Sequence, residues 1–157
     1  MKIIAFVVAL FVAAPVFAQD PSQFDPQRWF APGCPSCGVH AYVDLPHSGS
    51  ELSLSTIIAG WGFECVSGQP IDRVDVWYEE DGFWVPIKQA DGVLNFNVIA
   101  RPDVQTAYRA YCPNVALTSG WWMQLSTLPP AGARRVSFTI WRGPYYARIV
   151  RTYTVRP

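Results

Sequence analysis

The stretch IDRVDVWYE, residues 71–79, alternates between an apolar and a mostly polar set of side chains. Val74 and Val76 share one parity, whereas Arg73 and Asp75 share the other. Strict alternation is the pattern of an antiparallel strand with one face packed on a core and the other face in water. The stretch therefore predicts such a strand, and the same alternation can be looked for in the segments on both sides of it.

Short stretches of the same kind flank this one and are separated by turn residues. Strands are expected over residues 39–45, 52–64, 71–79, 83–87, 93–99, 120–128, 134–141 and 145–155. A short helical turn is expected near residues 102–108, because Pro102 stands close to its start. Many short strands with almost no helix are typical of a sandwich or barrel. We predict an all-β, immunoglobulin-like two-sheet β-sandwich of seven to eight strands.

The composition is that of a folded domain. The chain has 157 residues, of which 50% are hydrophobic and 15% are charged, and this balance excludes a disordered chain. Basic and acidic residues number 12 each. Because no overall basic field is present, the sequence gives no indication of nucleic-acid binding.

The charges are unevenly divided along the chain. Residues 19–100 hold 3 basic and 11 acidic residues, whereas residues 101–157 hold 8 arginines and one acid, Asp103. One interpretation is that strands from the two halves lie side by side and pair their charges. The other is a basic face that binds a partner. We favour the first interpretation, because surface charges are usually mixed.

The first 18 residues have the pattern of a secretory signal peptide. Lys2 precedes an apolar run over residues 3–14, and Val16-Phe17-Ala18 provides small residues for cleavage after Ala18. About 12 apolar residues are too few to span a hydrocarbon core of ~30 Å. No later stretch is apolar enough to do so. We therefore expect a secreted or periplasmic protein with no membrane span after cleavage.

A Pro/Gly-rich lead segment, residues 19–37, is expected to be extended and ends in the CxxC motif of Cys34 and Cys37. Thiols tend to pair in an oxidising compartment, which predicts a local structural disulfide. A thiol-redox pair is one alternative, although no helical pattern follows to stabilise a thiolate. A zinc site that adds His40 and His47 is another, although the spacing fits no common site.

Two cysteines remain, Cys65 and Cys112, and they are expected to pair by elimination. Together they enclose about 48 residues, and chain-entropy arithmetic for such a loop gives roughly 4 kcal/mol. This bond would supply a large share of the stability of a typical domain, which is about 5–15 kcal/mol.

Several segments taken together resemble a bacterial Ig-like domain, although each alone is short. They are HAYVDLP (residues 40–46), AGWGFEC (59–65), IDRVDVWY (71–78), RPDV (101–104) followed by AY (107–108), GWWMQL (120–125) and LPPAG (128–132). The resemblance covers about residues 38–155, and residues 38–157 are taken as the domain. It implies a secreted or cell-surface β-sandwich of a kind that commonly acts as a spacer or in adhesion.

No catalytic constellation is visible. The chain lacks a G-x-S-x-G nucleophile elbow and an H-E-x-x-H motif. Its two histidines, His40 and His47, fall near the first expected strand, where we expect surface positions. The acidic residues 79–81 are expected to form a solvated turn. Three aspartates, Asp44, Asp72 and Asp75, have no spacing that brings any two together. We expect neither enzymatic activity nor a metal or other cofactor.

The aromatic residues provide the candidate binding site. Trp61 and Trp121 are expected in the core, because Trp61 stands in the family-like strand and Trp121 shares parity with apolar neighbours. The candidates instead share parity with polar neighbours or point outward on the last strand; they are Trp77, Trp141, Tyr146, Arg148 and Trp122. In an immunoglobulin arrangement the strands that carry the first four lie in one sheet. They are therefore expected to form an outward platform suited to protein or sugar contact.

The platform has a structural alternative, and the functional hypothesis has two alternatives. The rings could pair with each other across strands, or lie beneath the lead segment through Trp29 and Phe30. Our functional hypothesis is an exported, non-catalytic Ig-like binding or adhesion module whose partner is an extracytoplasmic protein. A carbohydrate-binding module with a glycan partner is the first alternative. A thiol-redox or zinc protein that uses Cys34 and Cys37 is the second.

Overall fold

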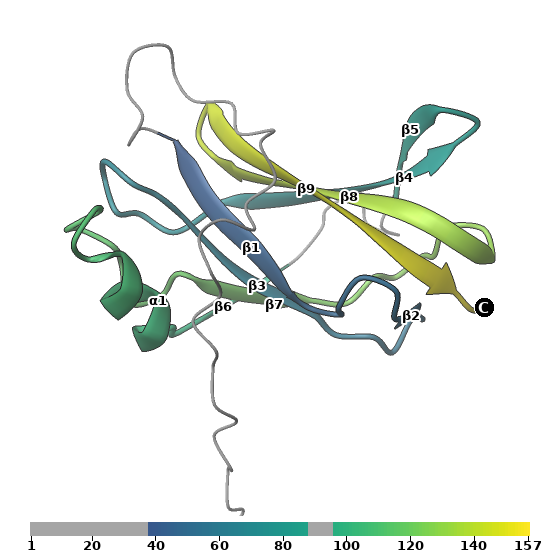
Figure 1. The fold of residues 1–157 in the computed structure, drawn as a ribbon, viewed down its shortest axis with the longest axis horizontal. Coiled ribbons are helices and arrows are strands. Elements are labelled where there is room, and N and C mark those ends of the chain that lie inside the picture. Colours follow the sequence, from purple (N-terminus) through teal and green to yellow (C-terminus); the bar gives the residue numbers. More distant parts are fainter. Residues whose placement is uncertain (1–37, 88–95) are drawn as a thin grey trace, which may run out of the picture.

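The computed structural model describes residues 38–87 and 96–157 of the chain. The expected signal peptide, the lead segment with Cys34 and Cys37, and the first part of the expected strand 93–99 lie outside these residues. The described elements, in chain order, are β1 (Val39–Leu45), β2 (Glu51–Leu52), β3 (Ile58–Glu64), β4 (Arg73–Glu80), β5 (Phe83–Pro86), β6 (Asn97–Ile99), α1 (Pro102–Tyr108), β7 (Gly120–Met123), β8 (Gly132–Arg142) and β9 (Tyr145–Val155) (Figure 1).

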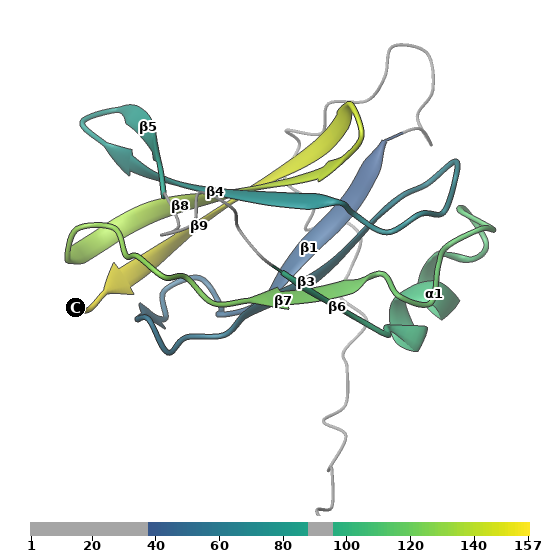
Figure 2. The same cartoon turned by 180° about the vertical axis from the view of Figure 1, so that it is seen from behind.

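The strands form two packed sheets, which confirms the predicted all-β sandwich. One sheet has the order β1-β3-β7-β6 and the other β2-β9-β8-β4-β5. All neighbours are antiparallel except β2, which runs parallel to β9. This is the immunoglobulin strand order, A-B-E-D facing C-F-G, with β5 in the position of strand C′. Figure 2 shows the two layers from behind, with α1 and the β4–β5 hairpin at opposite ends.

The expected strand over residues 52–64 is two strands, so the described part of the chain has nine strands rather than seven or eight. A hydroxyl-rich turn separates β2 from β3. The Ser53 N–H donates to the Thr56 hydroxyl, and the Thr56 N–H donates to the Ser53 carbonyl. Such side-chain bonds compete with a strand ladder. The chain therefore leaves one sheet after β2 and enters the other at β3.

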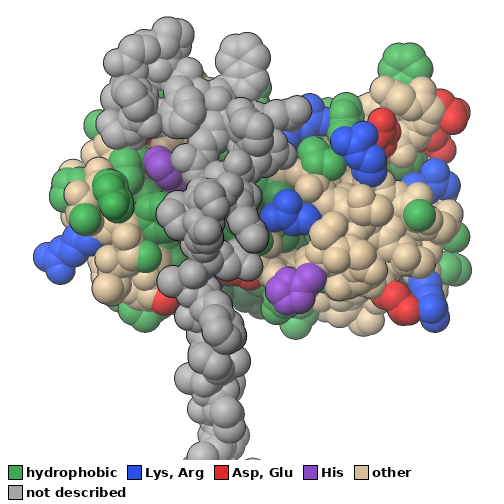
Figure 3. Space-filling model, in the orientation of Figure 1, with side chains coloured by type: hydrophobic (Ala, Val, Ile, Leu, Met, Phe, Trp, Pro, Cys, Tyr) green, Lys and Arg blue, Asp and Glu red, His purple; other side chains and the backbone are tan. Residues whose placement is uncertain are grey.

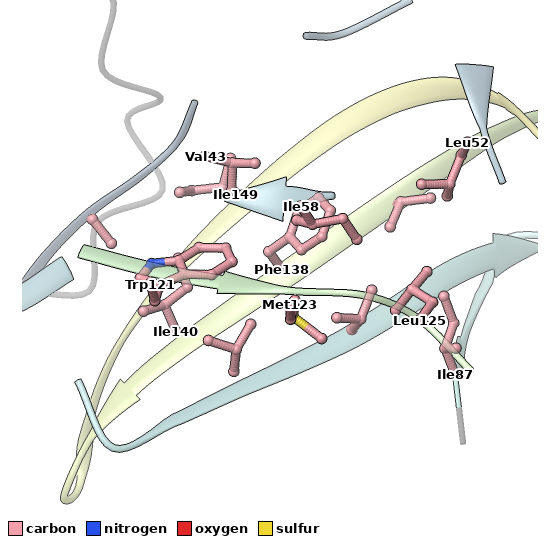
Figure 4. Close-up of a cluster of buried hydrophobic side chains, with 14 of the residues drawn as sticks. Val43, Leu52, Ile58, Ile87, Trp121, Met123, Leu125, Phe138, Ile140 and Ile149 are labelled. Carbon is pink, nitrogen blue, oxygen red and sulfur yellow. The ribbon is translucent and has the colours of Figure 1, made fainter. Parts of the chain in front are cut away.

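The core lies between the sheets and follows the predicted alternation (Figure 4). Val74 and Val76 of β4 are 0% and 2% exposed, whereas Arg73 is exposed and Asp75 half-buried. The largest fully buried side chains come from both sheets: Trp121, Tyr153, Phe63, Phe138, Leu52, Ile58, Met123 and Ile140. All but Phe63 belong to this main cluster.

A second apolar cluster covers the outer face of the four-stranded sheet. It joins Trp61 and Phe63 of β3 with Val104 of α1 and with the disulfide between Cys65 and Cys112. Trp61 is buried as predicted, but in this cluster and not between the sheets. The predicted pairing of the two cysteines is present, and it ties the end of β3 to the loop after α1.

Arg101 fixes α1 to the sheet. Its guanidinium contacts Asp103 in the first helical turn, with Nη2 to Oδ2 at 2.7 Å, and also contacts Asp44 on β1. Burial raises the pKa of Asp44 despite this contact, whereas the hydrogen bond from Arg101 lowers the pKa of Asp103. The Arg101 side chain is 18% exposed, whereas those of Asp44 and Asp103 are 34% and 32% exposed, so these contacts are partly shielded from water.

The uneven charges pair across the fold. Four ion pairs within the described ranges join an acid of the first half to an arginine of the second: Asp44–Arg101, Glu79–Arg135, Asp72–Arg142 and Glu51–Arg156. Figure 3 shows both signs spread over the visible face rather than one continuous basic area. The structure thus favours the charge-pairing interpretation.

Candidate functional site

Four of the five candidate residues share one surface, the outer face of the five-stranded sheet. Trp77 lies on β4, Trp141 on β8, and Tyr146 and Arg148 on β9, all half-buried. The register aligns Trp141 with Tyr146 and with Arg73, and these positions share the outward parity.

The fifth candidate, Trp122, does not join them. It lies on β7 between Ala59 and Asn97, on the outer side of the four-stranded sheet. Trp122 points outward from its sheet, as its polar neighbours predicted, but β7 belongs to the four-stranded sheet. Trp122 is therefore a half-buried tryptophan on the opposite side of the sandwich.

A first group of contacts centres on Trp141. Its ring lies 4.6 Å from that of Tyr146, centroid to centroid, at an interplanar angle of 43°. The guanidinium of Arg73 stands 4.5 Å from the centroid of the Trp141 ring. The indole N–H donates to Oδ2 of Asp75 at 2.7 Å, and Asp75 also pairs with Arg73 at 3.3 Å. These four side chains hold one another across three strands.

A second group centres on Trp84 of β5, which the sequence analysis did not identify. The guanidinium of Arg148 lies 4.4 Å from the centroid of the Trp84 ring, and that of Arg135 lies 5.8 Å away. The Arg148 Nε–H donates to the hydroxyl of Ser137 at 2.8 Å, and Arg135 pairs with Glu79. The β4–β5 hairpin rises from the sheet in Figure 1 and carries Trp84.

A local signal could have identified Trp84. Asp81 and Gly82 have φ values of +50° and +82°, as in the two-residue turns that an Asp-Gly pair favours. Such a turn places Glu79 opposite Trp84. Since Glu79 has the outward parity of β4, its cross-strand partner must also face outward.

The alternative that the candidate rings pair with each other across strands is confirmed for some of the rings and not for others. Trp141 and Tyr146 are directly opposite across β8 and β9, so they form a cross-strand pair. Trp77 lies opposite Ser137 and Pro86, and no ring contact to it occurs among the described residues. The other form of this alternative, in which the rings lie beneath the lead segment through Trp29 and Phe30, concerns residues outside the described ones.

The face combines aromatic rings with cations in fixed positions. The side chains of Arg73 and Arg135 are 56% and 55% exposed. Arg148 has no carboxylate partner within the described ranges, although its Nε is bound to Ser137. Ser137 is fully buried despite its outward parity. Such a face can bind apolar, aromatic and anionic groups at once.

The three aspartates considered as acid–base partners engage different groups. Asp44 contacts Arg101 on the four-stranded sheet, and Asp75 accepts from the indole of Trp141. Asp72 accepts from the backbone N–H of Gly143 at 2.8 Å. Each carboxylate is thus bound to a separate structural partner.

The two histidines lie at opposite ends of β1. His40 is half-buried on the outer face of the four-stranded sheet, where it stacks on Phe63 with a centroid distance of 5.5 Å, so its ring is only partly at the surface. His47 is exposed, beyond the end of the strand. Because an extended strand rises about 3.3 Å per residue, the two rings are too far apart to bind one ion. A zinc site that uses both histidines is therefore excluded.

Glu64, the last residue of β3, closes the turn that follows Cys65. Its carboxylate accepts from the backbone N–H of Val66 at 2.9 Å and of Ser67 at 2.7 Å. Burial by itself raises the pKa of Glu64, but the Ser67 side chain, the two backbone N–H groups and the charge of Arg142 together outweigh burial and hold the pKa below its ordinary value of 4.5. The ionised carboxylate therefore positions the loop that carries the disulfide.

Replacing Glu64 with glutamine is expected to reduce the dependence of stability on pH. Because folding lowers the pKa of Glu64, its carboxylate contributes fully to the free energy of unfolding above pH 4.5. This contribution is lost as the pH falls below that value. The wild type should lose stability more steeply below pH 4.5 than Glu64→Gln, which already loses about 1–2 kcal/mol at neutral pH. Urea unfolding at a series of pH values measures both effects, with exposed Glu51→Gln as the control. If the free energy of unfolding changed with pH in the same way for the wild type and Glu64→Gln, this role would be contradicted.

Comparison with known proteins adds no relative. No protein-family model matches the sequence, and a search of curated proteins gives no match. Within residues 38–87 and 96–157, no helix is long and apolar enough to cross a membrane. The resemblance to Ig-like domains therefore rests on the quoted residues and on the strand order.

Proposed function

We propose that this protein is an exported, non-catalytic binding domain that contacts a partner protein through the outer face of its five-stranded sheet. The aromatic–arginine face is the set Arg73, Trp77, Trp84, Arg135, Trp141, Tyr146 and Arg148. The observation that carries the proposal is the placement of two guanidinium groups on two tryptophan rings, beside a half-exposed Trp77 that contacts no other ring in the described chain. Tryptophan, tyrosine and arginine are the residues that contribute most at protein interfaces.

The geometry favours a protein partner over a glycan. A sugar stacks on an open ring face, whereas Arg73 lies over Trp141 and Arg148 lies over Trp84. Tyr146 and Trp141 are tilted by 43° and do not form one flat surface. A protein can instead use ring edges and the outer sides of the guanidinium groups, which accept carboxylates and carbonyls.

Two features support a location outside the cytoplasm. The first 18 residues have the signal-peptide pattern, and Cys65 and Cys112 form a disulfide, which persists in oxidising compartments. The resemblance to secreted Ig-like domains points the same way. We therefore place the partner in the same compartment, either secreted or periplasmic.

The proposal is tested by cross-linking followed by affinity measurement. A photo-reactive side chain at Thr152, which is exposed and pairs with Arg135 on this face, should cross-link one protein in intact source cells. The same group at exposed Thr118, beside the other sheet, is the control. The cross-linked protein is then purified and its affinity for the domain is measured.

The variants Trp77→Ala and Arg148→Ala should each weaken this binding by about tenfold or more, which corresponds to about 1.4 kcal/mol. Trp122→Ala is the matched control, because Trp122 is also half-buried but belongs to the other sheet. If Trp77→Ala and Trp122→Ala weakened the affinity for the partner equally, the proposed surface would be refuted. If the domain bound a glycan on an array and Trp77→Ala abolished that binding, the result would favour the carbohydrate alternative instead.

A further inference from the structure

The first half of β9 is an open edge of the five-stranded sheet. β9 pairs with β8 along its whole length, whereas β2 covers its other side only at Thr154 and Val155. The loop before β2 extends this cover to Thr152, whose carbonyl accepts from the Gly49 N–H at 2.6 Å. No strand of the described chain lies beside residues 146–150 on that side.

The backbone groups of alternate residues point toward this edge. In an antiparallel ladder, one residue bonds to the neighbouring strand and the next turns its N–H and C=O away from it. The Thr154 N–H donates to the Ser50 carbonyl at 3.0 Å, so Thr154 turns its backbone groups away from β8. By the same alternation, the three N–H groups and three carbonyls of Tyr146, Arg148 and Val150 point to the open side.

This edge has backbone groups to spare. Within the described ranges, only one of the six groups has a hydrogen-bond partner, the Val150 carbonyl, which accepts from Nη1 of Arg151 at 3.2 Å. At the opposite border of the sheet, the Ile87 N–H donates to the Val76 carbonyl on β4, so Pro86 faces the open side and offers no N–H there. Proline protects that border against a further strand, whereas β9 carries none.

The side chains along the open edge differ between its two faces. Tyr146 and Arg148 belong to the aromatic–arginine face, so a strand added beside β9 would continue that face. On the inner face, Ile149 is 7% exposed and Ala147 packs against the main core. An added strand would therefore place apolar side chains beside Ala147 and Ile149. An acidic side chain would suit the position beside Arg148, which pairs with no carboxylate of the described residues.

We propose that the partner adds an extended segment of alternating apolar and acidic residues as a further strand beside residues 146–150. This inference rests on the proposed function and states which part of the partner the aromatic–arginine face binds. Main-chain hydrogen bonds to an exposed edge give such an addition its affinity, and alternate side chains give it specificity. Five residues of strand extend over about 17 Å, which is the length of an ordinary strand.

Two other occupants suit the edge less well. A second copy that pairs about a two-fold axis at Arg148 would place two guanidinium groups opposite each other, which is unfavourable. The lead segment has four prolines, and its longest run without proline, residues 27–31, contains Arg28 and no acid. Proline has no N–H to donate, and a further arginine repeats the charge of the edge. Charge complementarity therefore favours an acidic strand from another protein.

The test uses the mature chain and a synthetic probe, the capped peptide Val-Glu-Val-Glu-Val-Glu-Val. Amide hydrogen exchange is followed residue by residue by NMR with and without saturating peptide. The amides of Tyr146, Arg148 and Val150 should exchange at least about tenfold more slowly with the peptide, because they gain hydrogen bonds. The amides of Ala147 and Ile149 already bond to β8 and should change little.

A charge exchange tests the role of Arg148. The parent should bind the glutamate peptide at least about tenfold more tightly than the same peptide with lysine at each glutamate position. Arg148→Glu should reverse this preference. Arg156→Glu is the matched control, because Arg156 is an exposed arginine beyond the end of β9 and the same charge change there should keep the preference of the parent.

Each other outcome overturns the added strand. A peptide that does not bind, that protects other amides, or that keeps its preference in Arg148→Glu would show that the edge does not accept an acidic strand. Slow exchange of the three amides in the free chain would assign the edge to the lead segment. Slowing that depends on protein concentration without peptide would assign it to a second copy.

The cross-linked partner separates this inference from the proposed function. If Trp77→Ala weakens the affinity for the partner but the partner leaves the amides of Tyr146, Arg148 and Val150 unprotected, the face binds without an added strand and only this inference fails. If the partner protects these amides but Trp77→Ala leaves its affinity unchanged, the edge binds the partner and the proposed face fails.

Discussion

Replacing Trp121 with alanine is expected to lower the free energy of unfolding by about 3–5 kcal/mol. Trp121 is fully buried on β7 and is the largest side chain of the core between the sheets. Its ring lies over Gly60 of the neighbouring strand, where an added Cβ would stand 2.8 Å from Cζ2 of the indole. The surrounding side chains come from both sheets (Figure 4), so the cavity cannot close by the shift of a single strand.

Urea unfolding of Trp121→Ala measures this loss. Trp122→Ala is the paired control, since the two residues are adjacent on β7 but face opposite sides of the sheet. We expect Trp122→Ala to cost about 1 kcal/mol, because Trp122 is only half-buried. If both variants lost the same free energy, the inward and outward assignment of β7 would be wrong.

Removing the disulfide by Cys65→Ser with Cys112→Ser is expected to cost about 4 kcal/mol. The two cysteines are 47 positions apart, so the bond greatly restricts the unfolded chain. In the folded state the bond lies in the second cluster, with Trp61 and Phe63, rather than between the sheets. The loss should therefore appear in the global free energy of unfolding while the main core keeps its packing.

Denaturation of the double variant and of the wild type under non-reducing conditions measures the effect. Cys34→Ser with Cys37→Ser is the control, because the disulfide predicted between these residues closes a short loop and would restrict the unfolded chain much less. A loss below about 1 kcal/mol for the Cys65 and Cys112 variant would contradict the account. It would mean that the loop contacts alone, such as Ala116 to Gly68, fix this end of the domain.

The fold was largely predictable because alternation survives in most of its strands. Val74 and Val76 set the inward face of β4, and Pro102 marks the start of α1 as expected. The break between β2 and β3 was missed, because the residues from Ser53 to Thr56 bond to one another and release β2 to the other sheet. A pattern read residue by residue does not contain this competition between side-chain and ladder hydrogen bonds.

The candidate site was predictable in its placement and not in its contacts. Parity was enough to put Trp77 and Trp141 on one face. It could not show that Trp84 reaches Arg148, since that contact depends on the direction in which the β4–β5 hairpin leaves the sheet. It also could not place Trp122, because strand parity does not say to which sheet a strand belongs.

The central claim is that the outer-face rings serve binding rather than stability, and Trp77 tests it most directly. It is half-buried, and no ring contacts it in the part of the chain that the structure describes. The measurement is the free energy of unfolding of Trp77→Ala by urea denaturation, beside that of the wild type. We expect a loss of about 1 kcal/mol or less. A loss of about 3 kcal/mol or more, as in a buried core position, would show that the ring is a structural element and would contradict the account.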